Sequence, residues 1–119
     1  MISKFDVSFL EDARQFLLKL EEKTRVKILY NIDKAKVLND PKLFKKLSDN
    51  IWEFRTKYDG LQYRLLAFWD KAQRTNTLIV LTHGFIKKVD KVSLSEINKA
   101  EQLRKLYFEQ KNSKNENKR

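Results

Sequence analysis

The chain has 119 residues, 41% of them hydrophobic and 12% aromatic, which is enough for one domain with its own core. Lysine and arginine number 26 against 16 acidic residues, so the net charge of +10 predicts a polyanionic partner. The absence of cysteine excludes disulfides and cysteine nucleophiles, and a single histidine excludes a site with two histidine ligands. The sequence has no apolar run of signal-peptide or membrane-span length, so we expect a cytoplasmic protein with no membrane contact.

The first predicted elements are a strand and a helix. Phe5, Val7 and Phe9 alternate with polar residues, which predicts a short strand that ends near Val7. Ser8 with Glu11 three residues later has the form of a capping box, so a helix is expected to begin at Ser8.

A second helix is expected over residues 24–38. Asp40 followed by Pro41 combines a capping residue with a proline at the first helical position, which predicts a further short helical turn. This turn is expected to bury three apolar residues, Leu43, Phe44 and Leu47.

The apolar period then changes to two, which predicts strands. Over residues 51–57 one face carries Trp52, Phe54 and Thr56, and the other carries Glu53, Arg55 and Lys57. A turn at residues 58–60 leads into a strand over residues 61–69.

Residues 70–76 form a polar connection, and residues 77–83 form the most strand-prone segment, which Gly84 is expected to end. Ser93 and Glu96 form a second capping box that opens the last helix. Residues 110–119 contain no apolar residue and are expected to be a disordered basic tail, so the domain is assigned to residues 1–109.

This order of elements predicts an α+β domain. We expect a mostly antiparallel sheet of about four strands, with the two N-terminal helices packed on the face that bears Trp52, Phe54 and Leu65. A one-residue error in register would place Glu53 and Arg55 on that face instead.

The candidate functional residues lie between residues 52 and 88. A charged stripe on the predicted sheet offers five cations and one carboxylate: Glu53, Arg55, Lys57, Arg64, Lys87 and Lys88. Two interpretations stay open, an anion-binding surface and a solvated face with ordinary ion pairs. His83 is either hydrogen-bonded at a strand end or catalytic, and Tyr63 is either a core residue or a base-stacking residue.

Three segments in order, residues 51–57 (IWEFRTK), 63–69 (YRLLAFW) and 82–88 (THGFIKK), resemble HigB-like toxins. These toxins form a phage-derived branch of the RelE/ParE superfamily of type II toxin–antitoxin systems. Residues 96–108 also resemble the C-terminal helix of that family. The chain departs from it at Lys91-Val92-Ser93, where the family usually has Lys-Thr-Pro, and the Ser93 capping box can replace the proline as a helix start.

The resemblance implies a RelE-like fold and a ribosome-dependent endoribonuclease that cleaves messenger RNA by attack of the 2′-hydroxyl, without a metal or other cofactor. It implies partners in the ribosome, messenger RNA and a HigA-like helix-turn-helix antitoxin, and contact with operator DNA only through that antitoxin. The implied catalytic residues are Glu53, Arg55, Arg64, His83 and Lys87, and the implied substrate-binding residues are Lys57, Tyr63 and Lys88.

Within this set, Glu53 is the candidate base, and the two arginines are suited to the scissile phosphate, with Arg64 expected to be an exposed strand residue. Lys87, Lys88 or His83 could protonate the leaving oxygen, and the sequence leaves this choice open. Two other functions also stay open, a ParE-like inhibitor of DNA gyrase and a non-catalytic RNA- or ribosome-binding module. The charged stripe favours the nuclease.

Overall fold

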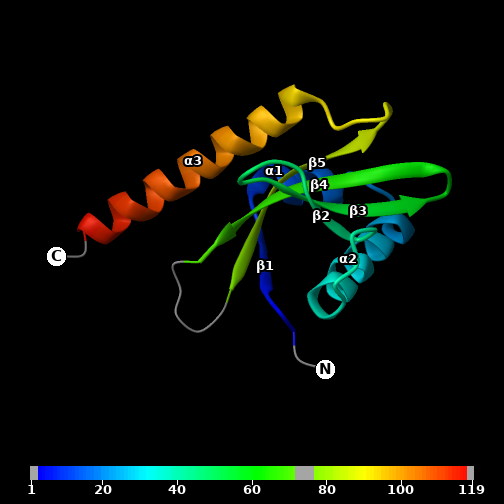
Figure 1. Ribbon diagram of the computed structural model, residues 1–119, viewed down its shortest axis with the longest axis horizontal. Helices are drawn as coiled ribbons and strands as arrows, with labels where there is room; N and C mark the ends of the chain where they lie inside the picture. The colour runs from blue at the N-terminus through cyan, green and yellow to red at the C-terminus, as the bar shows by residue number, and fades with distance from the viewer. Residues whose placement is uncertain (1–2, 72–76, 118–119) are drawn as a thin grey trace.

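A five-stranded mixed sheet runs through the middle of the molecule (Figure 1). The computed structural model describes residues 3–71 and 77–117. The spatial order of the strands is β1-β5-β4-β3-β2, with β1 parallel to β5 and the other neighbours antiparallel. Their bounds are β1 Asp6–Phe9, β2 Phe44–Lys46, β3 Trp52–Tyr58, β4 Leu61–Asp70 and β5 Leu78–Lys87.

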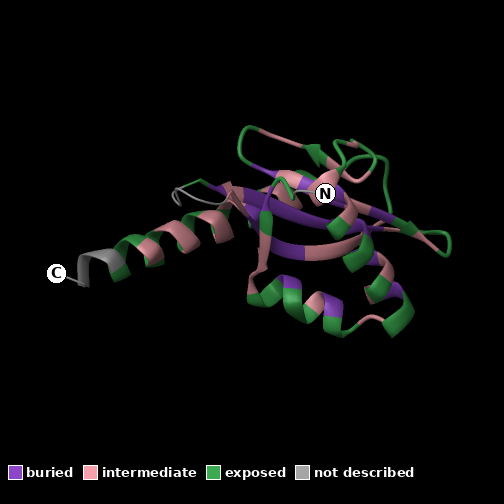
Figure 2. Cartoon of the chain, turned by 90° about the horizontal axis from the view of Figure 1, so that it is seen from below, coloured by how far each residue is buried: buried purple, intermediate pink, exposed green. Residues whose placement is uncertain are grey.

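Helices cover both faces of this sheet. Helix α1 (Glu11–Leu18) packs on β5 and α2 (Glu22–Val37) packs on β3, whereas α3 (Leu94–Asn117) crosses the opposite face and extends beyond it (Figure 1). Buried residues are concentrated in the strands, and exposed residues follow the outer sides of the helices (Figure 2). The predicted α+β class, with two N-terminal helices and a C-terminal helix, is confirmed.

The face under α1 and α2 carries the larger hydrophobic core. Phe54 and Leu65 from the sheet belong to one buried cluster with Ala13, Ile28 and Ile32 from the two helices. Asn31 adds a buried hydrogen bond from α2 to Thr56 Oγ1 on β3, at 3.1 Å. The predicted register of residues 51–57 is therefore correct, because a one-residue slip would have turned Glu53 into this core.

The other face is covered by α3 over only part of its area. Leu66, Phe68 and Val80 of the sheet pack with Ala100 of α3 in a second buried cluster. Further along the helix, Tyr107 Oη and Lys111 Nζ both donate to Asp70 Oδ2 at 2.6 Å. Because Asp70 is fully buried, these charge-assisted bonds fix the direction in which α3 leaves the sheet.

The same anchor explains why the chain is helical well beyond residue 109. Residues 110–117, which we expected to be a disordered tail, continue α3 in this structure. Half of residues 110–117 are serine or asparagine, which are weak helix formers, so the anchor at Lys111 and not helix propensity accounts for this extension. The domain boundary at residue 109 stays a prediction.

The two predicted capping boxes have different outcomes. Ser93 Oγ accepts a hydrogen bond from Glu96 N at 3.3 Å, so the N-cap of the second box is confirmed, whereas the Glu96 side chain contacts His83. The first was wrong: Ser8 lies in β1 opposite Val80, and α1 begins at Glu11 after Leu10, without a side-chain cap. Pairing with β5 holds the backbone of Ser8 extended, so β1 runs to Phe9 instead of ending at Val7.

Strand β2 was missed because it has only three residues. Asp40 Oδ1 does accept a hydrogen bond from Lys42 N at 2.9 Å, but no helix follows this turn. The chain instead pairs with β3, and the Phe44 ring stacks on Trp52 and Phe54 at centroid distances of 4.9 and 4.4 Å. The sheet therefore has five strands where we expected about four.

The two glycines serve different purposes. Gly60 has φ = 79° and follows Asp59 at φ = 52°, so the predicted turn between β3 and β4 is a tight hairpin turn with two left-handed residues. Gly84 does not end β5, which continues to Lys87. A Cβ atom at Gly84 would overlap the Phe16 ring of α1, lying 2.7 Å from its Cγ. Glycine is therefore required there for α1 to pack on β5.

Of the polar connection predicted at residues 70–76, Asp70 belongs to β4, and residues 72–76 lie outside the described residues.

Gly84→Ala is expected to lower the free energy of unfolding by about 1–3 kcal/mol, because the added methyl group overpacks the contact with Phe16. Chemical denaturation measures the loss. In the background of Phe16→Leu the same change should cost less, because the ring that it meets is gone. Equal costs in both backgrounds would show that Phe16 is not what excludes a side chain at residue 84.

Candidate active site

The part of the α3-side face that lies beside the hairpin turn is rich in charged groups, and we call it the polar face. Arg55 on β3 lies opposite Arg64 on β4, which in turn lies opposite Phe85 on β5. The neighbouring row on the side of the hairpin turn contains Lys57, Gln62 and Lys87. The neighbouring row on the side of α3 contains Glu53, Leu66 and His83. Directly opposite residues share a face, so the sheet brings most of the predicted site residues together.

Glu53 occupies the centre of this arrangement. Its Oε1 lies 3.3 Å from Arg55 Nε and its Oε2 lies 3.5 Å from Arg64 Nε. Only 4% of Glu53 is exposed, and the charges of the two arginines offset part of the cost of its burial, although Glu53 Oε2, Arg55 Nε and Arg64 Nε make no hydrogen bond. The carboxylate also offsets the repulsion between Arg55 and Arg64, because like charges directly opposite one another destabilise a sheet.

Arg64 is buried, which corrects the expectation that it is an exposed strand residue. It is 2% exposed, and its Nη1 and Nη2 donate to Tyr63 O at 3.1 Å and to Gln62 Oε1 at 2.6 Å. Burial lowers the pKa of the Arg64 guanidinium, while the Glu53 carboxylate raises it and the Arg55 charge lowers it. Arg64 Nε lies 3.5 Å from Glu53 Oε2 without a hydrogen bond, and the guanidinium has further N–H donors beyond its two bonds, so burial is what limits its contact with a phosphate.

The accessible cations surround this buried pair. Arg55 exposes 30% of its side chain and donates from Nη1 to Pro41 O at 3.3 Å. Lys57 is exposed at the end of β3, Lys87 is half-buried at the end of β5, and Lys88 follows it in an exposed position. An anion that approaches the polar face therefore meets Arg55 and the lysines before it meets Arg64.

His83 lies on the polar-face side of β5 but is enclosed. It is 3% exposed, its Nε2 lies 3.1 Å from Glu96 Oε1 in the first turn of α3, and its Nδ1 lies 3.0 Å from Thr82 Oγ1. A β-bulge makes Thr82 an extra residue between the pairs His83–Leu66 and Leu81–Ala67, which brings the Thr82 and His83 side chains together. The residue therefore ties β5 to α3 from within the strand and not from a strand end, and its catalytic role stays a prediction.

The ring protonation follows from these contacts. The pKa of His83 lies below its ordinary value of 6.5, because burial lowers it more than the hydrogen bond and the charge of Glu96 raise it. Two weaker charges act in opposite directions: Lys99 lowers this pKa and Asp12 raises it. A neutral ring satisfies Glu96 only if Nε2 carries the proton, which leaves Nδ1 as an acceptor. The single hydroxyl proton of Thr82 then has two acceptors in reach, His83 Nδ1 at 3.0 Å and Leu66 O at 3.2 Å.

Tyr63 is not part of this arrangement. It lies opposite Thr56, is 5% exposed, and belongs to the core under α1 and α2, on the opposite face from Arg64. Its phenol therefore points away from the polar face, and the structure does not bring it together with the other predicted site residues.

Three residues of the site were not identified from the sequence. Gln62 holds Arg64, while Thr82 and Glu96 hold His83. Gln62 could have been found, because it alternates with Arg64 on the strand that carries the charged stripe. Glu96 was assigned to the capping box of α3, and nothing in the local sequence indicates its contact with a residue 13 positions earlier.

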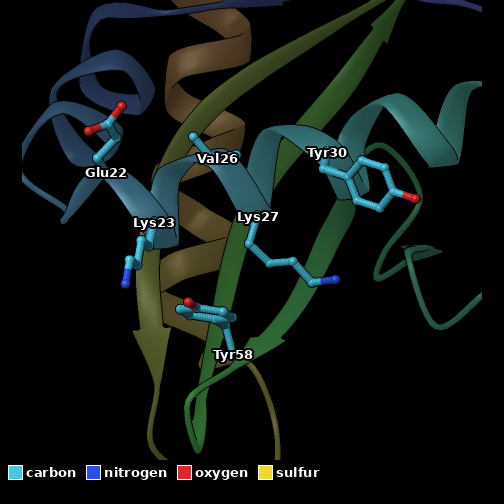
Figure 3. Close-up of a pocket in the computed structure, with 6 residues that line it drawn as sticks. All are labelled: Glu22, Lys23, Val26, Lys27, Tyr30 and Tyr58. Atoms are coloured by element: carbon cyan, nitrogen blue, oxygen red, sulfur yellow. The ribbon is translucent and has the colours of Figure 1, made fainter.

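A separate groove lies between α2 and the end of β3, with a volume of about 470 Å³ (Figure 3). Figure 3 shows Val26 and Tyr30 on α2 above Tyr58, with Lys23 and Lys27 at the rim. Its walls are apolar, and it holds no pairing of a carboxylate with arginines like the one on the polar face. The polar face is therefore the better candidate for chemistry.

The described residues also limit other kinds of site. Residues 3–71 and 77–117 hold no group of three His, Asp or Glu residues placed to bind a metal ion. Over the same residues, none of the helices combines the length and the hydropathy that crossing a membrane would require.

Comparison with known families gives one match. The model of the family described as Phage derived protein Gp49-like (DUF891) matches residues 15–105, which span both helical layers and the whole polar face. This family is associated with the toxins of toxin–antitoxin systems. No curated protein sequence matches the chain.

Arg64→Ala is expected to lower the free energy of unfolding by about 3 kcal/mol, because it leaves part of the buried Glu53 charge without its partner. Chemical denaturation measures the change. Arg14→Ala is the matched control, since its ion pair with Glu11 is exposed and should contribute nothing measurable. An equally small loss for both variants would contradict the burial of Arg64.

His83 is expected to make the protein less stable in acid. Because its pKa is lowered in the folded state, its contribution is complete above pH 6.5 and is lost as the pH falls toward the folded-state value. Urea midpoints at neutral pH and at about pH 5 should therefore differ more for the wild type than for His83→Gln, whose side chain does not titrate. An identical pH dependence for the two proteins would contradict the lowered pKa.

Proposed function

The chain belongs to the Phage derived protein Gp49-like family, and we propose that it is a type II toxin that cleaves messenger RNA on the ribosome. The observation that carries this proposal is the polar face, where a carboxylate lies between two arginines and is bordered by lysines. A buried ion cluster that serves only the fold does not need the further cations around it. The resemblance to HigB-like toxins supports the same reaction.

Cleavage by the 2′-hydroxyl has three requirements that the polar face can meet. The hydroxyl must lose its proton, the phosphorane must be stabilised while it carries extra negative charge, and the departing 5′-oxygen must gain a proton. The new bond joins the 2′-oxygen to phosphorus and the bond to the 5′-oxygen breaks. The products are therefore a 2′,3′-cyclic phosphate and a 5′-hydroxyl, and no water is consumed.

We assign the proton acceptor to Glu53 and the first phosphate contact to Arg55. Arg55 combines an exposed edge with an Nε that lies 3.3 Å from Glu53, so a phosphate on its guanidinium lies near the carboxylate. In this assignment the buried Arg64 contributes charge and orients Glu53. Direct contact of Arg64 with the scissile phosphate stays a prediction, and it requires the buried guanidinium to become accessible.

Lys87 is the better candidate for the proton donor to the leaving group. It stands at the end of β5 in the same row as Lys57 and Gln62, where its ammonium can reach a bound strand. His83 has both ring nitrogens engaged and is 3% exposed, so we assign it to the positioning of α3. Lys57 and Lys88 then hold the flanking phosphates.

The proposed partner that restrains this activity is a HigA-like helix-turn-helix antitoxin. A net charge of +10 favours an antitoxin surface rich in acidic residues, which would accelerate association. Operator DNA would be contacted through the antitoxin, and the isolated chain would bind DNA only weakly and without sequence preference.

Arg55→Ala is expected to lower the rate of message cleavage by about 100-fold, because it removes a preorganised cation from the developing charge. Primer extension on a message in a translation system of purified components measures the cuts, which should require ribosomes. Arg14→Ala, an exposed arginine on α1, is the control and should cleave at the wild-type rate.

Two outcomes would contradict the proposal. One is a wild-type protein that leaves ribosome-bound message intact while it inhibits DNA gyrase, which is the ParE-like alternative. The other is Arg55→Ala cleaving as fast as Arg14→Ala, which would make the polar face an ordinary solvated surface.

A further inference from the structure

We propose that a groove at the other end of β3 binds single-stranded RNA by stacking bases on two tryptophans and pairing phosphates with cations. The groove has a volume of about 390 Å³ and lies where the end of β4, the connection between β2 and β3, and α3 meet. Trp52 and Trp69 line it together with three cations, Lys46, Lys71 and Arg104.

The aromatic part of the groove is rigid. Trp52 and Trp69 meet edge to face at 5.7 Å and 81°, and Phe44 stacks on Trp52 at 4.9 Å from inside the core. Both indoles are half-buried, so one side of each is fixed by packing while the rest borders the groove. Rings held in this way stack on a base without losing further conformational entropy, and every base has a face that can stack.

The charged part of the groove favours a polyanion. Lys71 Nζ lies 5.7 Å from the Trp69 ring centroid and Lys46 is exposed. Arg104 projects from α3, where its Nη1 lies 3.8 Å from Glu101 Oε2. The carboxylate that lines the groove beside them is Asp49. An acidic peptide could pair with the cations, but half-buried indoles that line the groove next to them fit nucleobases attached to phosphates better.

The groove and the polar face meet only around the edge of the sheet, because Trp52 shares the α1/α2 side of β3 with Phe54, whereas Arg55 is on the other side. Lys45 lies opposite Glu53, and Lys46 lies opposite Trp52. From Trp52 to Arg55 is three residues of strand, or about 10 Å. If the proposed function holds, a message bound to both would pass around this edge of the sheet, whereas RNA binding by the groove does not itself depend on cleavage.

The tryptophan content makes this proposal directly measurable. The chain has two tryptophans, and both line the groove, so intrinsic fluorescence reports on its occupancy. Titration with a short oligouridylate, without ribosomes, should quench this fluorescence. Lys71→Ala should weaken binding several-fold and lower the slope of log affinity against log salt by about 0.7, as for one lost phosphate contact.

Lys19→Ala removes an exposed lysine at the end of α1 and is the matched control, which should bind like the wild type. Trp69→Leu should weaken binding about tenfold through lost stacking, with its unfolding midpoint measured to show that the fold persists. An equal loss of binding in Lys71→Ala and Lys19→Ala would overturn the proposal, because it would show that the overall positive charge drives binding and the groove does not.

Two further results would also overturn it. Equal quenching by an abasic oligomer would exclude stacking, and displacement of oligouridylate by polyglutamate at equal charge concentration would make the groove a protein-docking surface. The binding assay contains no ribosomes, so the two proposals can fail separately. Wild-type protein that binds oligouridylate but cuts no message would contradict the nuclease and leave the groove in place.

Discussion

The Glu53 carboxylate allows two arginine side chains to lie opposite each other in the interior of the sheet. Arg55 and Arg64 are directly paired across β3 and β4, where their repulsion would otherwise oppose strand pairing. Bridged by Glu53 at 3.3 and 3.5 Å, they form a cluster that retains one net positive charge. The polar face depends on this cluster, because its net positive charge lies where a bound anion would contact Arg55.

The position of α3 determines how much of that face stays open. Its first turn is tied to β5 through Glu96 and His83, and its later turns are tied to Asp70 through Tyr107 and Lys111. Between these two anchors the helix covers the apolar rows of the sheet and leaves the rows of Arg55 and Lys57 uncovered. Fold stability and access to the candidate site therefore depend on the same two polar contacts.

Local alternation was enough to predict which residues share the polar face, because Glu53, Arg55 and Lys57 alternate with a core that includes Phe54. It could not predict that Arg64 is buried, since that depends on Gln62 folding over it and on Glu53 reaching across from β3. Similarly, Gly84 has the sequence appearance of a strand end, but the Phe16 ring that requires it lies 68 positions earlier in the chain. Long-range contacts, which a local pattern does not contain, account for what was missed.

The account stands on the claim that the polar face drives attack by the 2′-hydroxyl of a ribosome-bound message. A message with one 2′-deoxynucleotide at the cleaved position tests this most directly, with the same substitution at the neighbouring nucleotide as the control. The account predicts that cleavage disappears at the modified position and persists in the control, because the attacking oxygen is missing only in the first. Cleavage of the modified message at the unmodified rate would contradict it.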